Sequence, residues 1–207
     1  MSERIGLYGG SFDPIHFGHL IPARSIAERL ALSRVVLIPS ARPPHKHSGT
    51  VADVRDRLAM ATLAVQGDPL FQVSDVELHR EGPSYTFDTV QQFRAMLHPA
   101  AELFWIIGAD SLPELPTWYR ISELVAAVTI VTVARPGWEG GELPALTVAV
   151  GPQLAEELLE NCYETPEIDI SSTDIWQRVG EARSIRYLTP DAVVSYIESH
   201  QLYRRSR

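Results

Sequence analysis

Two histidines, His16 and His19, follow a glycine-rich stretch near the start of the 207-residue chain. Side chains three positions apart lie on the same side of a helix start, so both imidazoles can reach one anion. Gly18 lies between them and lets a ligand approach the backbone closely. The spacing predicts a phosphate site that both histidines contact. The alternative is a glycine turn with two incidental histidines.

The flanking segments favour the phosphate interpretation. Residues 5–8 are apolar and are predicted to form a buried strand, and residues 23–30 are predicted to form a helix. A strand, a glycine turn and a helix bring free backbone N–H groups and the positive end of the helix dipole to one point, where phosphate binds.

Strand and helix patterns alternate along the rest of the chain, which predicts an α/β fold with a doubly wound, mainly parallel sheet in a single domain. Further strands are expected at residues 35–39, 71–76, 103–107, 128–133 and 167–170. Polar clusters directly follow these strands, and ligands bind at the carboxyl ends of strands in such sheets.

Helices are expected between these strands. Asp53 is expected to open a helix with one apolar stripe, and Thr189 begins a last helix with Pro190 at its first position. The stripe consists of Val54, Leu58, Ala61 and Val65. Residues 87–97, 121–127 and the segment after 171 are also expected to be helical, whereas no element is assigned to 138–151.

Composition limits the function classes. The formal charge of −8 argues against broad nucleic-acid binding, and no apolar run is long enough to cross a bilayer. The single cysteine, Cys162, excludes an intramolecular disulfide and fits a reducing compartment. No signal-peptide pattern opens the chain, so a cytoplasmic location is expected, with no nucleic-acid or membrane partner. A homo-oligomer is compatible with the sequence.

The pattern Gly10-x-Phe12-Asp13-x-x-His16-x-Gly18-His19 resembles the signature of nucleotidyltransferases that carry an HxGH motif. The resemblance implies a Rossmann-like nucleotidyltransferase fold for residues 1–207, with a C-terminal helical part from about residue 171 packing on the core. It also implies that the two histidines are catalytic and steady the ATP phosphates. Asp110 would lie near the nucleotide sugars, and the alternative is a loop aspartate that only forms a turn.

A second pattern, Ile170-Ser171-Ser172-Thr173-x-Ile175, resembles the ATP-binding helix start of adenylyltransferases for pyridine nucleotides. Hydroxyl groups and free N–H groups at a helix start form an anion site, although an ordinary helix cap is the alternative. The chain departs from the family at Trp176, where the family usually has arginine, and Arg178 or Arg135 is the candidate replacement. The ATP-binding residues implied in this way are Gly9, Gly10, Ser11, Phe12, Gly18, Gly108, Asp110, Arg135, Ser171, Ser172, Thr173 and Arg178.

A third set resembles the substrate-binding residues of bacterial nicotinate-mononucleotide adenylyltransferases. Trp118 would offer an aromatic plane to the pyridine ring, and Thr86 with the backbone N–H of Tyr119 would bind its carboxylate. The alternative for the aromatic pair is surface packing after a proline turn. Lys46, on a proline-rich loop, is either a mobile cation that contacts a phosphate or a solvated loop charge.

Together the resemblances imply transfer of AMP from ATP to nicotinate mononucleotide, giving deamido-NAD and pyrophosphate. Mg²⁺ would be held mainly by the ATP phosphates, so no metal ligand is assigned to the chain. A phosphopantetheine adenylyltransferase, a cytidylyltransferase and an inactive nucleotide-binding sensor are the alternatives. The choice between nicotinate and nicotinamide mononucleotide depends on pocket donors that the sequence does not show.

Overall fold

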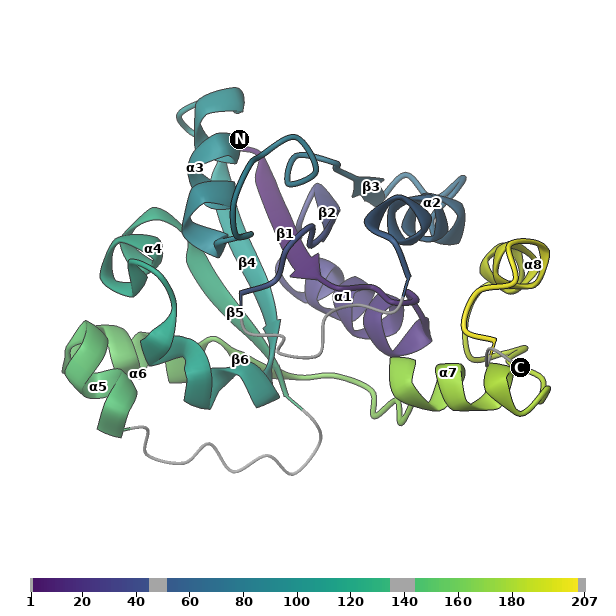
Figure 1. Cartoon of the computed structure of the whole chain (residues 1–207). Helices are drawn as coiled ribbons and strands as arrows, with labels where there is room; N and C mark the ends of the chain where they lie inside the picture. The colour runs from purple at the N-terminus through teal and green to yellow at the C-terminus, as the bar shows by residue number, and fades with distance from the viewer. Residues whose placement is uncertain (1, 45–51, 135–143, 205–207) are drawn as a thin grey trace.

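The computed structural model describes residues 2–44, 52–134 and 144–204. The strands in these ranges form one six-stranded parallel sheet in the order β3-β2-β1-β4-β5-β6 (Figure 1). They are β1 (Arg4–Gly10), β2 (Arg34–Pro39), β3 (Phe71–Val73), β4 (Glu102–Gly108), β5 (Thr129–Ala134) and β6 (Cys162–Glu164). Successive strands are added on one side of β1 up to β3 and then on its other side from β4. The doubly wound parallel sheet is confirmed, with its switch in strand order between β1 and β4.

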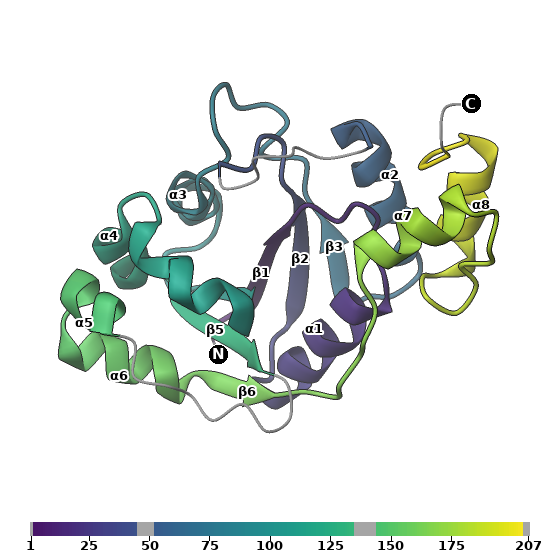
Figure 2. The same cartoon turned by 60° about the horizontal axis from the view of Figure 1, so that its bottom comes forward.

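Helices cover both faces of the sheet (Figures 1 and 2). One layer holds α1 (Phe17–Arg29), α2 (Val54–Ala64), α7 (Ser172–Gly180) and α8 (Asp191–Ser199). The other holds α3 (Thr86–Met96), the 3-10 helix η1 (Ala109–Thr117), α4 (Ile121–Ala127), α5 (Pro144–Val150) and α6 (Pro152–Glu160).

Each layer has its own hydrophobic core, and β4 contributes to both. Phe104 and Ile106 pack into the core under α1 and α2, while Trp105 and Ile107 pack into the opposite core. Successive side chains of a strand point to opposite faces, so the continuous apolar run of β4 is what a strand covered on both faces requires.

The C-terminal helices lie beside α2 and the start of α1 (Figure 1). The Tyr196 hydroxyl in α8 donates to Oδ1 of Asp56 in α2 at 2.9 Å. Just before α8, the buried Thr189 hydroxyl donates to the backbone carbonyl of Ile15 at 2.7 Å. Within the described ranges, no helix is both long and apolar enough to span a membrane.

Some expected elements differ from the structure. The predicted strand at 167–170 is wrong: β6 ends at Glu164, and the chain continues to α7 without regular structure. Pro190 is the N-cap of α8 rather than its first residue. The stripe predicted for α2 is only half right, because Arg57 and Met60 are fully buried while Val54 and Leu58 are only partly buried.

Other boundaries shift by a few residues. β3 ends at Val73, three residues before the end of the strand expected at 71–76. The stretch 138–151, to which no element was assigned, includes α5 at its end.

Candidate active site

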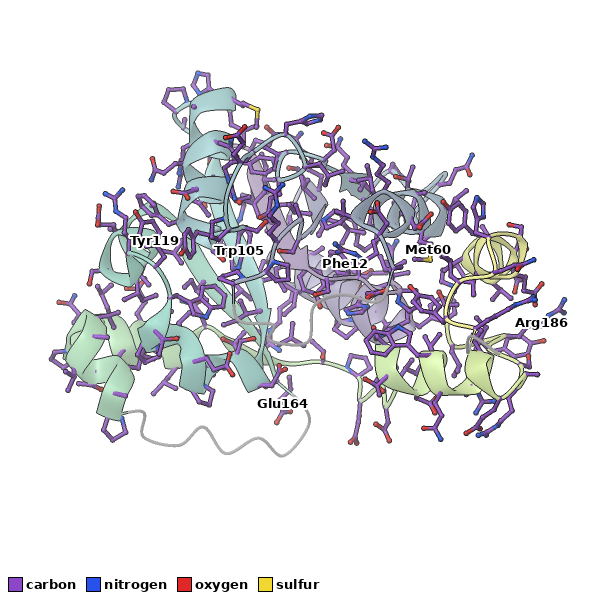
Figure 3. The ribbon with its side chains drawn as sticks, viewed as in Figure 1. Phe12, Met60, Trp105, Tyr119, Glu164 and Arg186 are labelled. Atoms are coloured by element: carbon purple, nitrogen blue, oxygen red, sulfur yellow. The ribbon has the colours of Figure 1, made fainter. Side chains whose placement is uncertain are left out.

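A cavity of about 770 Å³ opens at the carboxyl ends of the strands. Its walls include the ends of β1 and β4, so it lies at the switch in strand order. In the view of Figure 3, Trp105 lies between Phe12 and Tyr119, and all three line the cavity. The predicted site residues that line it are Gly9, Gly10, Ser11, Phe12, Gly18, His19, Thr86, Gly108, Asp110, Trp118 and Tyr119.

At two positions of the first motif, neighbouring atoms lie so close to the backbone that only glycine fits. A Cβ on Gly9 would lie 2.6 Å from Cζ2 of the buried Trp105 ring. A Cβ on Gly18 would lie 2.9 Å from Nδ1 of His16 and 3.0 Å from the backbone oxygen of Ile170. Any side chain at Gly18 would therefore push apart the histidine motif and the segment that leads into α7.

The two histidines occupy different surroundings. His19 lines the cavity, whereas His16 lies behind it and is 5% exposed. Their ring centroids are 3.8 Å apart, and the backbone N–H of His16 donates to Nδ1 of His19 at 3.2 Å. Because Nδ1 accepts this bond, a neutral His19 carries its proton on Nε2, where it can donate to an anion.

His16 is neutral at physiological pH. Burial lowers the pKa of its imidazole from 6.5 to about 4. Its Nδ1 is buried and has no hydrogen-bond partner within the described ranges. The structure thus places one histidine at the cavity wall and an uncharged one packed against its ring.

The second motif lies directly beside the first. Ser171 caps α7, and its Oγ accepts from the backbone N–H of Asp174 at 3.1 Å. The Ser172 hydroxyl donates to the backbone carbonyl of Pro14 at 3.2 Å. The two chain turns therefore meet, as the shared ATP site predicted from the sequence requires.

The serines and threonine of the second motif are set back from the cavity. Ile170 lines the cavity. Among the described residues that form its wall, Ser171, Ser172, Thr173 and Arg178 do not appear. The Arg178 Nε donates to the backbone carbonyl of Ser184 at 2.9 Å. Two further predicted residues, Lys46 and Arg135, lie outside the described residues.

The residues predicted to bind the pyridine ring come together around Tyr119, which lies across Trp105 from Phe12 in Figure 3. The His19 ring lies on the Phe12 side, with its centroid 5.1 Å from that of Phe12. Thr86 is the first residue of α3, and Trp118 directly follows η1. The Tyr119 ring stacks on Tyr85 with centroids 4.5 Å apart and planes 27° apart. This end therefore combines aromatic surfaces with a hydroxyl at a helix start, which suits a planar ring that carries an anionic group.

A buried carboxylate at the cavity wall, Glu77, was missed by the sequence analysis. Glu77 is 4% exposed and accepts hydrogen bonds from the Thr89 hydroxyl at 2.7 Å and the Ser40 hydroxyl at 3.2 Å. Arg80 lies 3.9 Å away and offsets its charge. Its place directly after the strand predicted at 71–76 was a usable signal, because ligands bind at the carboxyl ends of the strands in such sheets.

Tyr8 is a second missed residue of the cavity wall. Its ring meets those of Phe12 and His19 edge-on, with centroid distances of 5.4 and 6.3 Å. Burial, and then the charge of Asp110, raise the pKa of its phenol, so the hydroxyl keeps its proton. In the sequence Tyr8 is indistinguishable from an ordinary apolar residue of β1.

Among the described residues, no group of three or more His, Cys, Asp or Glu side chains is arranged to hold a metal ion. The cavity wall nevertheless includes the carboxylates of Glu77, Asp110 and Glu167. A divalent cation in this cavity would need a ligand that brings its own oxygen atoms, as a triphosphate does.

Comparisons with known proteins agree with this geometry. The family model described as cytidylyltransferase-like matches residues 7–178. A "Probable nicotinate-nucleotide adenylyltransferase" of Geobacillus thermodenitrificans (strain NG80-2) is 45% identical, with 97% of this chain and 86% of the relative covered. A relative of the same name from Roseiflexus sp. (strain RS-1) is 47% identical over 98% of this chain and 99% of its own.

Solved structures share the fold at lower identity. The Plasmodium falciparum nicotinic acid mononucleotide adenylyltransferase complexed with NaAD gives a TM-score of 0.75 at 18% identity, over 97% of both chains. The same enzyme complexed with APC gives 0.73 at 18% identity, also over 97% of both. These solved structures therefore share the fold of this chain.

Proposed function

The chain belongs to the cytidylyltransferase-like family, and we propose that it transfers the adenylyl group of ATP to nicotinate mononucleotide. The family predicted from the histidine motif is thereby confirmed. One observation carries the proposal: a single cavity joins the glycine turn and His19 at one end to Thr86, Trp118 and Tyr119 at the other. The relatives of 45% and 47% identity, named for this reaction, support it over nearly their full length.

In this reaction a phosphate oxygen of the mononucleotide attacks the α-phosphorus of ATP. The new P–O bond gives deamido-NAD, and the bond to the β-phosphate oxygen breaks to release pyrophosphate. Backbone N–H groups of the glycine turn and the Nε2–H of His19 would donate to the phosphates and stabilise the charge that develops on pyrophosphate. Catalysis then consists of alignment and charge stabilisation, without an adenylylated side chain.

The pyridine ring would lie against the aromatic side chains at the far end of the cavity. Thr86 begins a helix of 11 residues, whose positive end favours a carboxylate. The buried Glu77 nearby is already supplied with donors and offset by Arg80, so it does not cancel that preference. On this basis nicotinate, rather than nicotinamide, is the proposed ring.

Mg²⁺ would arrive with ATP and neutralise charge on its phosphates, which supply most of its ligands. Residues 1–207 would act as a single nucleotidyltransferase domain. The single cysteine suits a reducing compartment, and we place the reaction in the cytoplasm.

The direct test supplies MgATP or MgCTP with nicotinate mononucleotide, nicotinamide mononucleotide or phosphopantetheine, and follows pyrophosphate release and product by chromatography. We expect deamido-NAD to form with the highest kcat/KM. Faster turnover of phosphopantetheine, or a preference for CTP over ATP, would assign the chain to a sister activity. No pyrophosphate with any acceptor would indicate a nucleotide-binding sensor.

His19→Ala should lower kcat by roughly 10²- to 10³-fold, the usual loss for one preorganised donor. The matched control is His79→Ala, because His79 is exposed and pairs with Asp75 away from the cavity. Turnover by His19→Ala close to the wild-type rate at saturating ATP would contradict the role given to His19.

A further inference from the structure

The backbone of residues 11–15, which follows the glycine turn, is held from outside by side chains far away in the sequence. Its carbonyl groups accept hydrogen bonds from α2 and from the C-terminal part of the chain. Arg57 donates to Ser11 O at 2.5 Å, Trp176 to Asp13 O at 2.6 Å, Ser172 to Pro14 O at 3.2 Å and Thr189 to Ile15 O at 2.7 Å. Three of the four donors come from the last 36 residues, 172–207.

Asp13 is the centre of this arrangement. Its side chain is 1% exposed and accepts from the Tyr203 hydroxyl at 2.6 Å and from the backbone N–H of Ala52 at 3.3 Å. The guanidinium of Arg57, which is fully buried, lies near enough to interact with this carboxylate. The Trp176 ring stacks on Tyr203, with centroids 6.1 Å apart. Trp176 and Tyr203, which stack on each other, thus donate to the backbone and to the side chain of Asp13 respectively.

One of these contacts determines where an N–H group of the turn points. In a planar trans peptide the C=O and the following N–H lie on opposite sides. Holding the Ser11 carbonyl toward Arg57 therefore directs the Phe12 N–H the other way, and Phe12 lines the cavity. Without these side-chain hydrogen bonds to its carbonyl groups, the turn would no longer hold its backbone N–H groups in line with a bound anion.

We propose that Trp176 and Tyr203 are positioning residues for ATP, which lock Asp13 and thereby hold the glycine turn in its phosphate-binding shape. The inference rests on the proposed function, because it assigns the turn to ATP. It also accounts for the departure at position 176: the indole N–H is used on Asp13 O instead of on the nucleotide. The end of the chain, in this view, completes a site formed near its beginning.

The test compares Tyr203→Phe with Tyr196→Phe in the full-length chain. Each substitution removes one hydroxyl that donates to an aspartate, Asp13 or Asp56 respectively, and each keeps the aromatic ring. Only Asp13 belongs to the segment that follows the glycine turn. Titration calorimetry with MgATP alone gives the dissociation constant, and steady-state assays give KM for each substrate.

We expect Tyr203→Phe to weaken ATP binding about 3- to 10-fold, as loss of one hydrogen bond predicts, with KM for nicotinate mononucleotide within twofold of wild type. Trp176→Phe, which keeps a ring but loses the indole N–H, should behave likewise. Tyr196→Phe should bind ATP within twofold of wild type, with a melting temperature similar to that of Tyr203→Phe.

Three results would overturn the inference: wild-type ATP affinity in both Tyr203→Phe and Trp176→Phe, an equal loss of affinity in Tyr196→Phe, or an equal rise of both KM values. Failure of the proposed function is distinguishable from these results. A wild-type chain that binds ATP without adenylylating nicotinate mononucleotide refutes the proposed function. The ATP affinities of Tyr203→Phe and Tyr196→Phe would then still decide whether Tyr203 positions the turn. A wild-type chain that binds no ATP refutes both.

Discussion

At the scale of single residues, His16 links the stability of the chain to pH. Its pKa is about 4 in the folded chain against 6.5 in the unfolded one. As the pH falls below 6.5 the unfolded chain takes up the proton first, so folding stability is complete at neutral pH and declines toward pH 4. The lost contribution amounts to about 2 kcal/mol between pH 7 and pH 5.

Urea unfolding at pH 7 and pH 5 checks this prediction. His16→Gln should lose about 2 kcal/mol less than the wild type between the two pH values. His79→Gln, which changes an exposed histidine, serves as the control and should follow the wild type. An identical pH dependence in wild type and His16→Gln would mean that burial does not depress the His16 pKa.

Gly18 is the residue at which the two anion motifs are closest. A methyl group there would contact His16 and the Ile170 backbone, and a backbone carbonyl cannot rotate aside as a side chain can. Gly18→Ala should therefore lower kcat by roughly 10- to 100-fold through displacement of His19 and the segment before α7. The measurement is steady-state turnover alongside a thermal melt.

The control for that substitution is Gly6→Ala, in which the added methyl would lie 2.9 Å from a terminal methyl of Leu32. The added methyl would crowd the hydrophobic core under α1 and α2. The melting temperature should therefore drop, while kcat stays within about threefold of the wild-type value. Equal losses of turnover in the two variants would show that Gly18 matters for packing alone.

At the scale of elements, the long apolar strands were predictable, whereas β6 and the irregular segment at 167–170 were not. β1, β2, β4 and β5 are apolar runs, as strands covered on both faces must be. The three residues of β6 carry too little pattern to be recognised. Ile168 and Ile170 alternate like a strand, yet they do so because they line the cavity.

The candidate site divides in the same way. Its glycine turn and histidines were identified because their types and spacing recur in a known signature. Arg57 and Asp13 are buried polar residues whose contacts depend on partners 46 to 190 positions away. No local periodicity distinguishes such a residue from one that faces solvent, so its role became visible only with the folded chain.

Between the elements, the Thr89–Glu77 hydrogen bond joins α3 to the loop after β3. Thr89→Val keeps the side-chain shape but leaves a buried carboxylate with one donor fewer, which should cost about 1–3 kcal/mol of unfolding free energy. Because α3 begins at Thr86, we expect KM for nicotinate mononucleotide to rise more than KM for ATP.

Chemical denaturation and steady-state kinetics measure both effects. Thr62→Val in α2 is the matched control, since the Thr62 hydroxyl donates to the Leu58 carbonyl on an exposed helix face. It should leave stability and both KM values nearly unchanged. Equal increases in the two KM values for Thr89→Val would show that the Glu77 contacts support the fold without shaping the pyridine end.

At the scale of the whole molecule, the cavity has two ends that belong to different parts of the sheet. Gly9 and Gly10 end β1 and His19 lies in α1, whereas Trp118 and Tyr119 lie beyond β4 and η1. A ligand that binds only the folded state raises stability by about 2.7 kcal/mol at 100 times its dissociation constant. For a chain of this size that corresponds to roughly 5–10 °C in melting temperature.

The two ends should therefore respond to ligands separately. MgATP and nicotinate mononucleotide, each added alone, should both raise the melting temperature of the wild type. His19→Ala should reduce the response to MgATP and keep the response to the mononucleotide, while Trp118→Ala should do the reverse. If each variant lost both responses in equal measure, the cavity would be one undivided pocket, and the assignment of its ends to different substrates would have to be abandoned.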